Sequence, residues 1–195
     1  PSFEGLAPIS LFADDVYLIA STPAYLTVML KALQSSMGLL GLSINAGKCA
    51  YLCNRWVRSR FPPSLNRVAI PYAKDGKLNV LGTTITGDGS SEADARLRLA
   101  KAWAAFWSQW RLLGNSAAPL RGRLALLERV VEGTWLYNAG TWDITEREVT
   151  SFEKQHVAMV ARMLRLKRGP AEGYVTFYRR SRRTARQYAW RNSLP

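Results

Sequence analysis

The sequence has very little of the residues from which many metal and catalytic sites are built. Its 195 residues include two cysteines and a single histidine, His156. One histidine argues against a Ser-His-Asp site or a histidine-rich metal site. Cys49 and Cys53 lie four residues apart with no second group of cysteine or histidine nearby, which is poor spacing for zinc. We therefore expect two reduced thiols in strands or in the core of an intracellular protein.

Long apolar runs are also missing. No stretch approaches the roughly 18 apolar residues that a membrane-spanning helix needs. The first residues, Pro1 to Gly5, lack the basic and apolar regions of a signal peptide. We therefore expect no membrane partner. Because the sequence does not begin with Met, we also expect a fragment of a longer protein.

Acidic residues are scarce beside basic ones. The chain has 27 Lys and Arg against 14 Asp and Glu, which gives a net charge of +13 and a pI near 10.3. A polyanion is the natural partner of such a chain, and nucleic acid is the class we favour, although a ribosomal or membrane-surface protein could share the charge. The 48% of hydrophobic residues are ample for a folded core.

The pattern of apolar residues changes near residue 90. Up to about Gly89, short alternating segments are separated by turn residues, and later segments have the period of a helix. The first part, residues 1–90, therefore predicts an α+β fold. Its expected elements are a hairpin of Ile9–Ala13 and Val16–Ala20, a helix from Pro23 to Leu40, strands at Cys49–Cys53 and Val68–Ile70, and a turn at Asp75-Gly76 leading into Leu78, Val80 and Leu81.

Residues 91–168 predict three helices with short links, which is typical of a bundle. The helices are expected to run from Ser91, from about Pro119 to Tyr137, and from Thr145, which begins a capping box, to about Leu166. The first should bury one face, which we interpret as core or an interdomain face rather than a base-stacking platform. That face holds Leu97, Ala100, Trp103, Ala104, Trp107 and Trp110.

Residues 169–195 form a basic tail, either a helix or a disordered arm. Six arginines between Arg179 and Arg191 are interspersed with Tyr178, Tyr188 and Trp190. The charge pattern is typical of phosphate binding or of nuclear targeting, and the sequence leaves both open.

Asp14 and Asp15 are the residues most suggestive of chemistry. Two carboxylates at the tip of a hairpin repel each other unless a cation lies between them. Their hard oxygen atoms suit Mg²⁺, with Mn²⁺ as the alternative, and nucleotidyl transfer by two metal ions uses such ligands. Taken alone, the dipeptide is also ordinary turn chemistry.

The surrounding residues resemble a known family. Leu11 to Val16 resembles the aromatic-Ala-Asp-Asp box of reverse transcriptases. Gly41 to Asn45, with Lys48 three residues on, is similar to that family's next motif, Gly-Leu-x-x-Asn-x-x-Lys. Leu78 to Gly82 looks like the hairpin called the primer grip. Leu136 to Trp142 resembles the Leu-Tyr-Gly-x-x-x-Trp segment of non-LTR, or LINE-type, retrotransposon polymerases.

The four motifs come in the right order over roughly residues 6 to 166. The resemblance implies an RNA-directed DNA polymerase, with a partial palm in residues 1–90 and a helical thumb in residues 91–168. Its implied partners are an RNA template with a DNA primer and deoxynucleoside triphosphates, and its implied cofactor is Mg²⁺.

The resemblance also assigns residues. Asp14 would bind the metal with Asp15 as its neighbour in the carboxylate cluster, and Lys48 would approach the triphosphate as a charge or as an acid. Phe12, where Tyr is commoner, would pack near the primer end, and Leu81 and Gly82 of the primer grip would contact nucleic acid. Cations of the thumb would contact the phosphates of the duplex; the candidates are Arg96, Arg98, Lys101, Arg111, Arg121 and Arg123.

One part of the family's site has no counterpart. The palm of the family supplies another metal-binding Asp and a substrate-positioning segment well upstream of the hairpin, and only thirteen residues precede Asp14. We therefore expect the remainder of the polymerase upstream and no polymerisation by this chain alone. The alternatives are a group II intron maturase or retron-like polymerase, which Leu136 to Trp142 disfavours, and a non-catalytic basic nucleic-acid-binding module.

Overall fold

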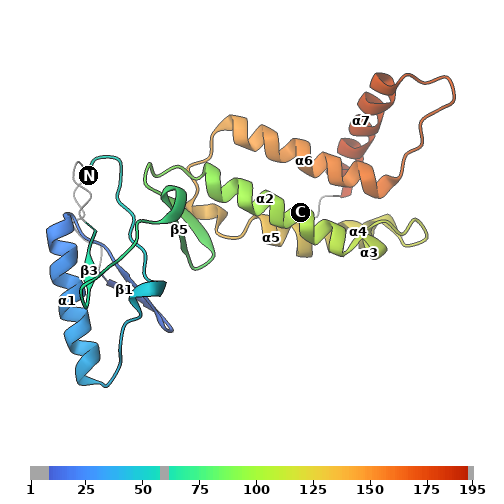
Figure 1. The fold of residues 1–195 in the computed structure, drawn as a ribbon. Coiled ribbons are helices and arrows are strands. Elements are labelled where there is room, and N and C mark those ends of the chain that lie inside the picture. Colours follow the sequence, from blue (N-terminus) through green and yellow to red (C-terminus); the bar gives the residue numbers. More distant parts are fainter. Residues whose placement is uncertain (1–8, 58–61, 193–195) are drawn as a thin grey trace. The chain divides into compact units, whose positions relative to one another are not determined.

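The structure is a computed structural model that describes residues 9–57 and 62–192. Residues 1–8 and 58–61 of the predicted palm, and 193–195 of the predicted tail, lie outside the described residues. The chain divides into two compact units, Pro1–Ser90 and Ser91–Pro195, each with its own core. The predicted α+β class is confirmed, because helices accompany three two-stranded antiparallel sheets in the described parts of the chain (Figure 1).

The first unit begins with a hairpin of β1 (Ile9–Phe12) and β2 (Asp15–Leu18). Phe12 pairs with Asp15, so the two turn residues are Ala13 and Asp14. The sequence placed the turn one residue later, at Asp14 and Asp15. Asp15 instead joins the strand, where the hydroxyl of Tyr17, two residues on and thus on the same face, donates to it.

The helix α1 (Pro23–Leu39) begins as the sequence predicts. The side chain of Thr22 accepts a hydrogen bond from the amide of Tyr25 at 3.1 Å, and Pro23 fills the first turn. The helix ends before Gly41, whose φ of +70° suits glycine. Only two residues of the expected core face are buried, Met29 and Leu30, and three are partly buried, while Leu40 is 74% exposed.

The rest of this unit consists of short elements. They are η1 (Ala46–Lys48), β3 (Ser64–Leu65) paired with β4 (Val68–Ala69), η2 (Lys74–Gly76), and β5 (Lys77–Val80) paired with β6 (Thr83–Thr86). The predicted strand Cys49–Cys53 is wrong. This segment forms one isolated parallel bridge, between Tyr51 and Tyr72, so it has no continuous ladder. Its core is correspondingly small: Leu30, Tyr51, Leu65 and Ile70.

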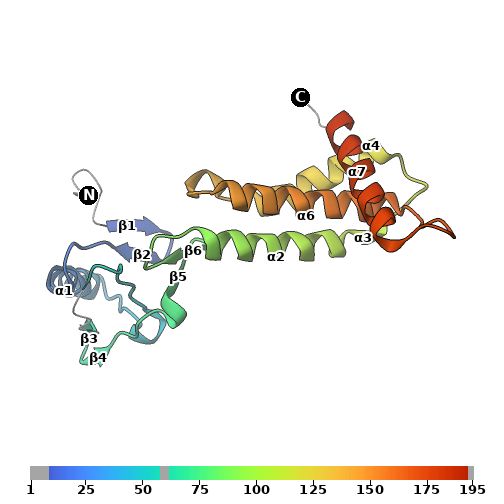
Figure 2. The same cartoon turned by 90° about the horizontal axis from the view of Figure 1, so that it is seen from above.

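The second unit is helical (Figures 1 and 2). Its elements are α2 (Glu92–Ser108), α3 (Trp110–Leu113), α4 (Leu120–Leu126), the π-helical η3 (Leu127–Glu132), α5 (Gly133–Trp135), η4 (Ala139–Thr141), α6 (Glu146–Leu164) and α7 (Tyr174–Asn192). The helices α2 and α6 run side by side, and α7 packs against α6. The second predicted helix is thus one helical run with a π-helical middle. The basic tail, for which the sequence allows a helix or a disordered arm, is a helix of this unit.

The buried face of α2 is not the face that the sequence predicts. Ala95, Ala102 and Phe106 are buried, and Phe106 is fully enclosed. Leu97 is exposed and Trp107 is 50% exposed, whereas Trp103 and Trp110 pack at the edge of the core. The large tryptophan rings pack on neighbouring rings at the surface of the unit, while smaller residues approach the other helices.

The start of α6 agrees with the sequence prediction, whereas the start of α2 does not. Thr145 and Glu148 form the predicted capping box of α6, and the hydrogen bonds from Thr145 lower the pKa of the Glu148 carboxyl. Ser91 does not cap α2. Its hydroxyl instead accepts a hydrogen bond from the amide of Asp143 at 3.0 Å, which ties the start of α2 to the segment before α6. None of the described helices is long and apolar enough to cross a membrane.

Candidate metal and nucleic-acid site

The acidic hairpin places two carboxylates in solvent. Asp14 lies in the turn and Asp15 is the first residue of β2, and both are exposed. Ala13 beside them has a φ of +52°, which is uncommon for a residue with a side chain. Strained backbone of this kind is often found at functional sites, where the surrounding structure maintains it.

Tyr17 connects this hairpin with a second one. Its hydroxyl donates to Oδ2 of Asp15 at 3.1 Å, and the backbone of Leu81 hydrogen-bonds to the same phenol. Desolvation raises the pKa of Tyr17, and the hydrogen bond to Asp15 and the charges of Asp15 and Asp14 raise it further. The acidic turn and the turn at Leu81 are therefore neighbours, although Leu81 lies 64 positions after Tyr17 in the chain.

The second hairpin turns through Leu81 and Gly82, between β5 and β6. Their φ angles are +49° and +81°, and positive angles at both central residues are what a tight two-residue hairpin requires. Gly82 adopts this conformation without steric cost, whereas the branched side chain of Leu81 does not. Leu81 is 43% exposed, so packing of its side chain does not by itself account for this conformation.

The carboxylates fit a magnesium ion only in part. Asp14 and Asp15 offer hard oxygen donors, which Mg²⁺ prefers, and this ion commonly uses one or two carboxylates together with water and substrate phosphates. Within residues 9–57 and 62–192, no group of three or more His, Cys, Asp or Glu is arranged to hold a metal. The hairpin could therefore supply two ligands, with the others coming from phosphate oxygens or from another polypeptide segment.

Lys48 is exposed at the end of η1. The side chain of Asn45 caps this turn by accepting from the amide of Gly47 at 2.9 Å, so Asn45 of the second motif shapes the backbone before Lys48. Among the described residues, none of the ion pairs involves Lys48. The structure thus does not join Lys48 to the carboxylates. The next residue, Cys49, is a free thiol whose pKa burial raises.

Phe12 lies at the end of β1, directly opposite Asp15. Its side chain is 61% exposed, and that of Leu11 is 67% exposed. Both faces of this two-stranded sheet therefore carry uncovered apolar surface next to the carboxylates. Such surface is typical of a place where another molecule or another part of a protein binds.

Arg123 is not available for a phosphate, contrary to the prediction. It is 8% exposed, and its Nη1 donates to the carbonyls of Leu113 and Met163 at 3.1 and 2.9 Å. Its Nε donates to the carbonyl of Ala118 at 3.2 Å. A guanidinium can satisfy several orphan carbonyls at once, so Arg123 joins the ends of α3 and α6.

Arg98 is likewise buried, at 6% exposure, with its guanidinium 4.1 Å from the ring centroid of Tyr137. The segment that holds Tyr137 contacts α2 a second time, because Nε1 of Trp142 donates to the buried carboxylate of Asp94 at 2.9 Å. Between them, Asn138 has a φ of +61°, a conformation that Asn tolerates. Residues 136–142 thus fold onto α2, and Arg98 is removed from the predicted phosphate contacts.

The other predicted cations are exposed: Arg96, Lys101, Arg111 and Arg121. Arg96 forms an ion pair with Glu92 one turn before it. Pairs of this kind in solvent are worth little, so Glu92 is a weak competitor for a phosphate. These cations are positioned by rigid helices and can contact an anionic backbone.

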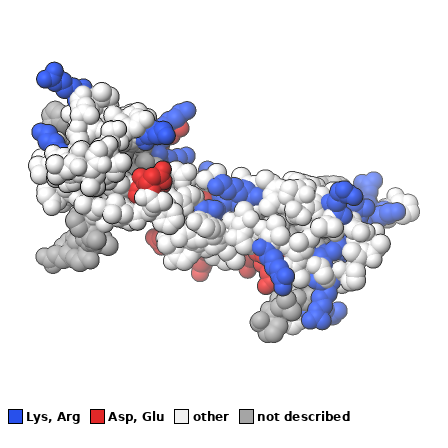
Figure 3. Space-filling model, turned by 90° about the horizontal axis from the view of Figure 1, so that it is seen from below, with Lys and Arg blue, Asp and Glu red and all other residues white. Residues whose placement is uncertain are grey.

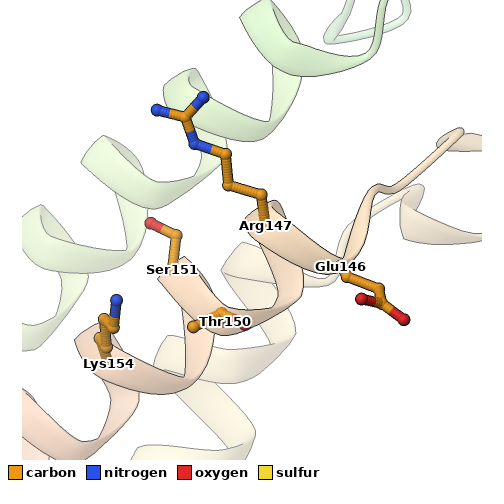
Figure 4. Close-up of a pocket in the computed structure, with 5 residues that line it drawn as sticks. All are labelled: Glu146, Arg147, Thr150, Ser151 and Lys154. Carbon is orange, nitrogen blue, oxygen red and sulfur yellow. The ribbon is translucent and has the colours of Figure 1, made fainter.

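A shallow depression of about 500 Å³ lies along α6 and adds basic residues that the sequence analysis missed. It is lined by Glu146, Arg147, Thr150, Ser151 and Lys154. Figure 4 shows Arg147, Ser151 and Lys154 directed to one side of α6, with Glu146 pointing away. Their spacing of four and three residues is the signal that could have identified them, because residues so spaced share a helix face.

Comparison with known proteins does not assign the chain to a family. Family models, curated proteins and solved structures were each compared with it, and none of them matches.

Proposed function

We propose that this chain is the C-terminal palm and thumb part of an RNA-directed DNA polymerase of the non-LTR retrotransposon type. The observation that carries the proposal is the contact of two strained hairpins through Tyr17, which donates to Asp15 and meets the backbone of Leu81. These hairpins hold the two motifs that resemble the metal-binding box and the primer grip. A site that brings a primer end to a metal ion needs these two parts side by side.

Asp14 and Asp15 would hold Mg²⁺, with Mn²⁺ as a substitute, and the ion would lower the barrier to nucleotidyl transfer by neutralising charge on the phosphates. The hydrogen bond from Tyr17 fixes the orientation of Asp15, so this carboxylate is held ready in one position. The exposed Phe12 and the turn at Leu81 and Gly82 would contact the primer. Lys48 would reach the triphosphate only in the bound complex.

The helical unit would bind the duplex of RNA template and DNA primer. Arg96, Lys101 and Arg121 are exposed on helices, and Arg147 and Lys154 line the depression on α6. Contacts of this kind recognise the charge and spacing of phosphates and not the base sequence. A thumb that must follow any template needs such contacts.

The apolar surface of the first unit supports the expectation that an upstream segment completes the palm. Leu11, Phe12 and Val28 are 67%, 61% and 61% exposed, and Leu39 is 90% exposed. Covering this surface would stabilise the hairpin that carries the carboxylates. By itself, the chain is expected not to extend a primer.

Two measurements on the 195-residue chain test the proposal. Titration with Mn²⁺ should broaden the NMR signals of residues 13–16 and 80–82 before others, because both turns lie near the ion. The double variant Asp14→Asn, Asp15→Asn should lose this broadening. The variant Asp75→Asn, which changes an exposed acid at another turn of the same unit, should keep it.

The second measurement is the affinity for an RNA–DNA duplex at several salt concentrations. Replacing Arg96, Lys101 and Arg121 by Gln should lower the slope of log K against log salt by about 2 to 3, at roughly 0.9 for each lost phosphate contact. A chain that binds the duplex but responds to Mn²⁺ equally with and without its two carboxylates would be a non-catalytic nucleic-acid-binding module.

A further inference from the structure

The helix α7 presents a basic surface that the proposed polymerase site does not use. Its inner side is fixed against the rest of the unit, since Ala185 is fully buried and Ser181 is 8% exposed. Figure 3 shows lysine and arginine side chains gathered at the end of the helical unit that carries α7. The helix has no acidic residue from Tyr174 to Asn192.

Two of its arginines serve the fold. Nε and Nη2 of Arg180 each donate to a carboxylate oxygen of Glu172 at 2.8 Å, and Nη2 also donates to the carbonyl of Lys167 at 2.9 Å. The pKa of Glu172 falls to about 2, chiefly because of the hydrogen bond from Arg180. Arg182 donates to the carbonyl of Lys154 at 2.6 Å and lies over the ring of Tyr178. These bonds fix α7 and the loop before it in one position.

Three other arginines face solvent along one stripe. Arg179, Arg183 and Arg186 are exposed, and their spacing of four and three residues places them on the same side of the helix. None of the ion pairs among the described residues includes any of them. From Arg179 to Arg186 the helix rises about 10 Å, at roughly 1.5 Å per residue. The stripe therefore offers a row of cations on a rigid support.

An exposed aromatic ring extends this row. Trp190 continues the stripe four residues after Arg186 and is 82% exposed. The exposed rings of Tyr174 and Tyr178 stack with centroids 6.5 Å apart, but their spacing places them on the side of α7 that holds Ala185 and not on the stripe. Cations that follow a backbone, combined with rings on which bases can stack, are the usual means of binding single-stranded nucleic acid.

A membrane surface is the other polyanion that a basic helix can bind. Such a helix inserts its apolar face between lipids. The small apolar residues Ala185 and Ala189 pack against the core of the unit, so this part of α7 is not available for insertion into lipid. The row of arginines and the exposed ring of Trp190 thus fit a polymer of phosphates and bases better than a lipid surface.

We propose that the exposed face of α7 binds single-stranded nucleic acid, with Arg179, Arg183 and Arg186 on phosphates and Trp190 stacked on a base. The residues of this surface differ from those proposed for the duplex contacts of α2, α4 and α6. It does not depend on the polymerase function. RNA and DNA share the phosphates and bases that it would recognise.

The test measures fluorescence anisotropy of labelled oligo(U) and oligo(dT) with the whole chain at several salt concentrations. Replacing the three arginines by Gln should weaken binding at least about tenfold and lower the salt slope by about 2, at roughly 0.7 for each phosphate of a single strand. Trp190→Ala should weaken binding by about fivefold or more. The triple Arg→Lys variant should keep most of the affinity.

The matched control removes three positive charges from the first unit, with Lys31, Lys74 and Lys77 replaced by Gln, all of them exposed. It should bind within about twofold of the parent chain, because it leaves the proposed contacts intact. Equal losses in the control and in the α7 variant would overturn the proposal. Unchanged binding by the α7 variant would do so as well. Circular dichroism should show the same helix content in all variants.

Two further arms separate the alternatives. The variant at Arg96, Lys101 and Arg121 should lose duplex affinity and keep single-strand affinity, so the polymerase proposal and this one can fail independently. Vesicles of phosphatidylcholine and phosphatidylserine should not compete with the oligonucleotide for the chain. Competition that disappears in the triple Arg→Gln variant would assign α7 to a membrane surface and overturn the proposal.

Discussion

The two units of the chain differ in how completely they bury their apolar residues. In the second unit Phe106, Val131, Met159 and Val160 have no exposed surface. Among the described residues of the first unit, only Leu65 is enclosed to a similar degree, and Leu11, Leu39 and Leu40 are largely exposed. The helices of the second unit thus form a complete core, while the first unit has a small one beneath uncovered apolar surface.

The unit with the more complete core is therefore not the unit that holds the candidate metal site. The carboxylates and both strained turns belong to the unit with the smaller core, and segments with few buried contacts open more easily. The second unit holds its cations on a rigid framework. We therefore expect substitutions in the second unit to affect stability most, and the first unit to gain most from a partner.

The largest expected effect is in the core of the second unit. Phe106→Ala should lower the free energy of unfolding of the second unit by about 3 to 5 kcal/mol, because the substitution removes a fully buried ring and leaves a cavity. Urea unfolding followed by hydrogen exchange of the α2 and α6 amides would measure this loss. Trp107→Ala, one residue away and half exposed, is the control and should cost clearly less. Equal losses would contradict the assignment of Phe106 to the core and of Trp107 to the surface of the second unit.

The next effect distinguishes two arginines on α4. Arg123→Gln should cost roughly 2 to 4 kcal/mol, since it leaves buried carbonyls of Leu113 and Met163 without their donor. Arg121→Gln should change the free energy of unfolding by no more than about 0.5 kcal/mol, because that side chain is exposed. Denaturant unfolding gives both values. If the Arg123→Gln variant were as stable as the parent chain but bound the duplex more weakly, Arg123 would be a phosphate contact and not a structural residue.

The smallest effect concerns pH and the loop before α7. The pKa of Glu172 is about 2 in the folded chain, below its ordinary value of 4.5. Its contribution to stability is therefore complete above about pH 4.5 and is lost as the pH falls towards 2. NMR titration should show the Glu172 carboxyl and Nε of Arg180 changing together in this range. The variant Glu172→Gln should show no such change at Arg180, and an ordinary pKa for Glu172 would contradict the ion pair.

Local sequence rules predict where helices and hairpins lie better than they predict which side chains those elements bury. Thr22 before Pro23 and the pair of Thr145 and Glu148 identify helix starts by themselves, because a cap needs only neighbouring residues. The hairpin at Asp14 was also predictable, but its turn lies one residue earlier than expected. The register depends on pairing between Phe12 and Asp15, which turn propensity does not determine.

Burial could not be predicted in the same way. Arg98 and Arg123 look like surface cations in the sequence, and their partners, the ring of Tyr137 and the carbonyl of Met163, lie 39 and 40 residues further along. The contact of Tyr17 with Leu81 is of the same kind, because it joins two hairpins that are distant in the chain. Long-range packing decides these roles, and no local pattern reports it.

Primer extension on a primed RNA template is the most direct test of the central claim. The protein to use is the product of the complete reading frame that contains these 195 residues. We predict incorporation of deoxynucleotides that requires Mg²⁺ or Mn²⁺, that Asp14→Asn abolishes, and that Asp75→Asn leaves unchanged. No incorporation, or equal incorporation by the Asp14→Asn variant, would contradict the assignment of this hairpin to a polymerase site.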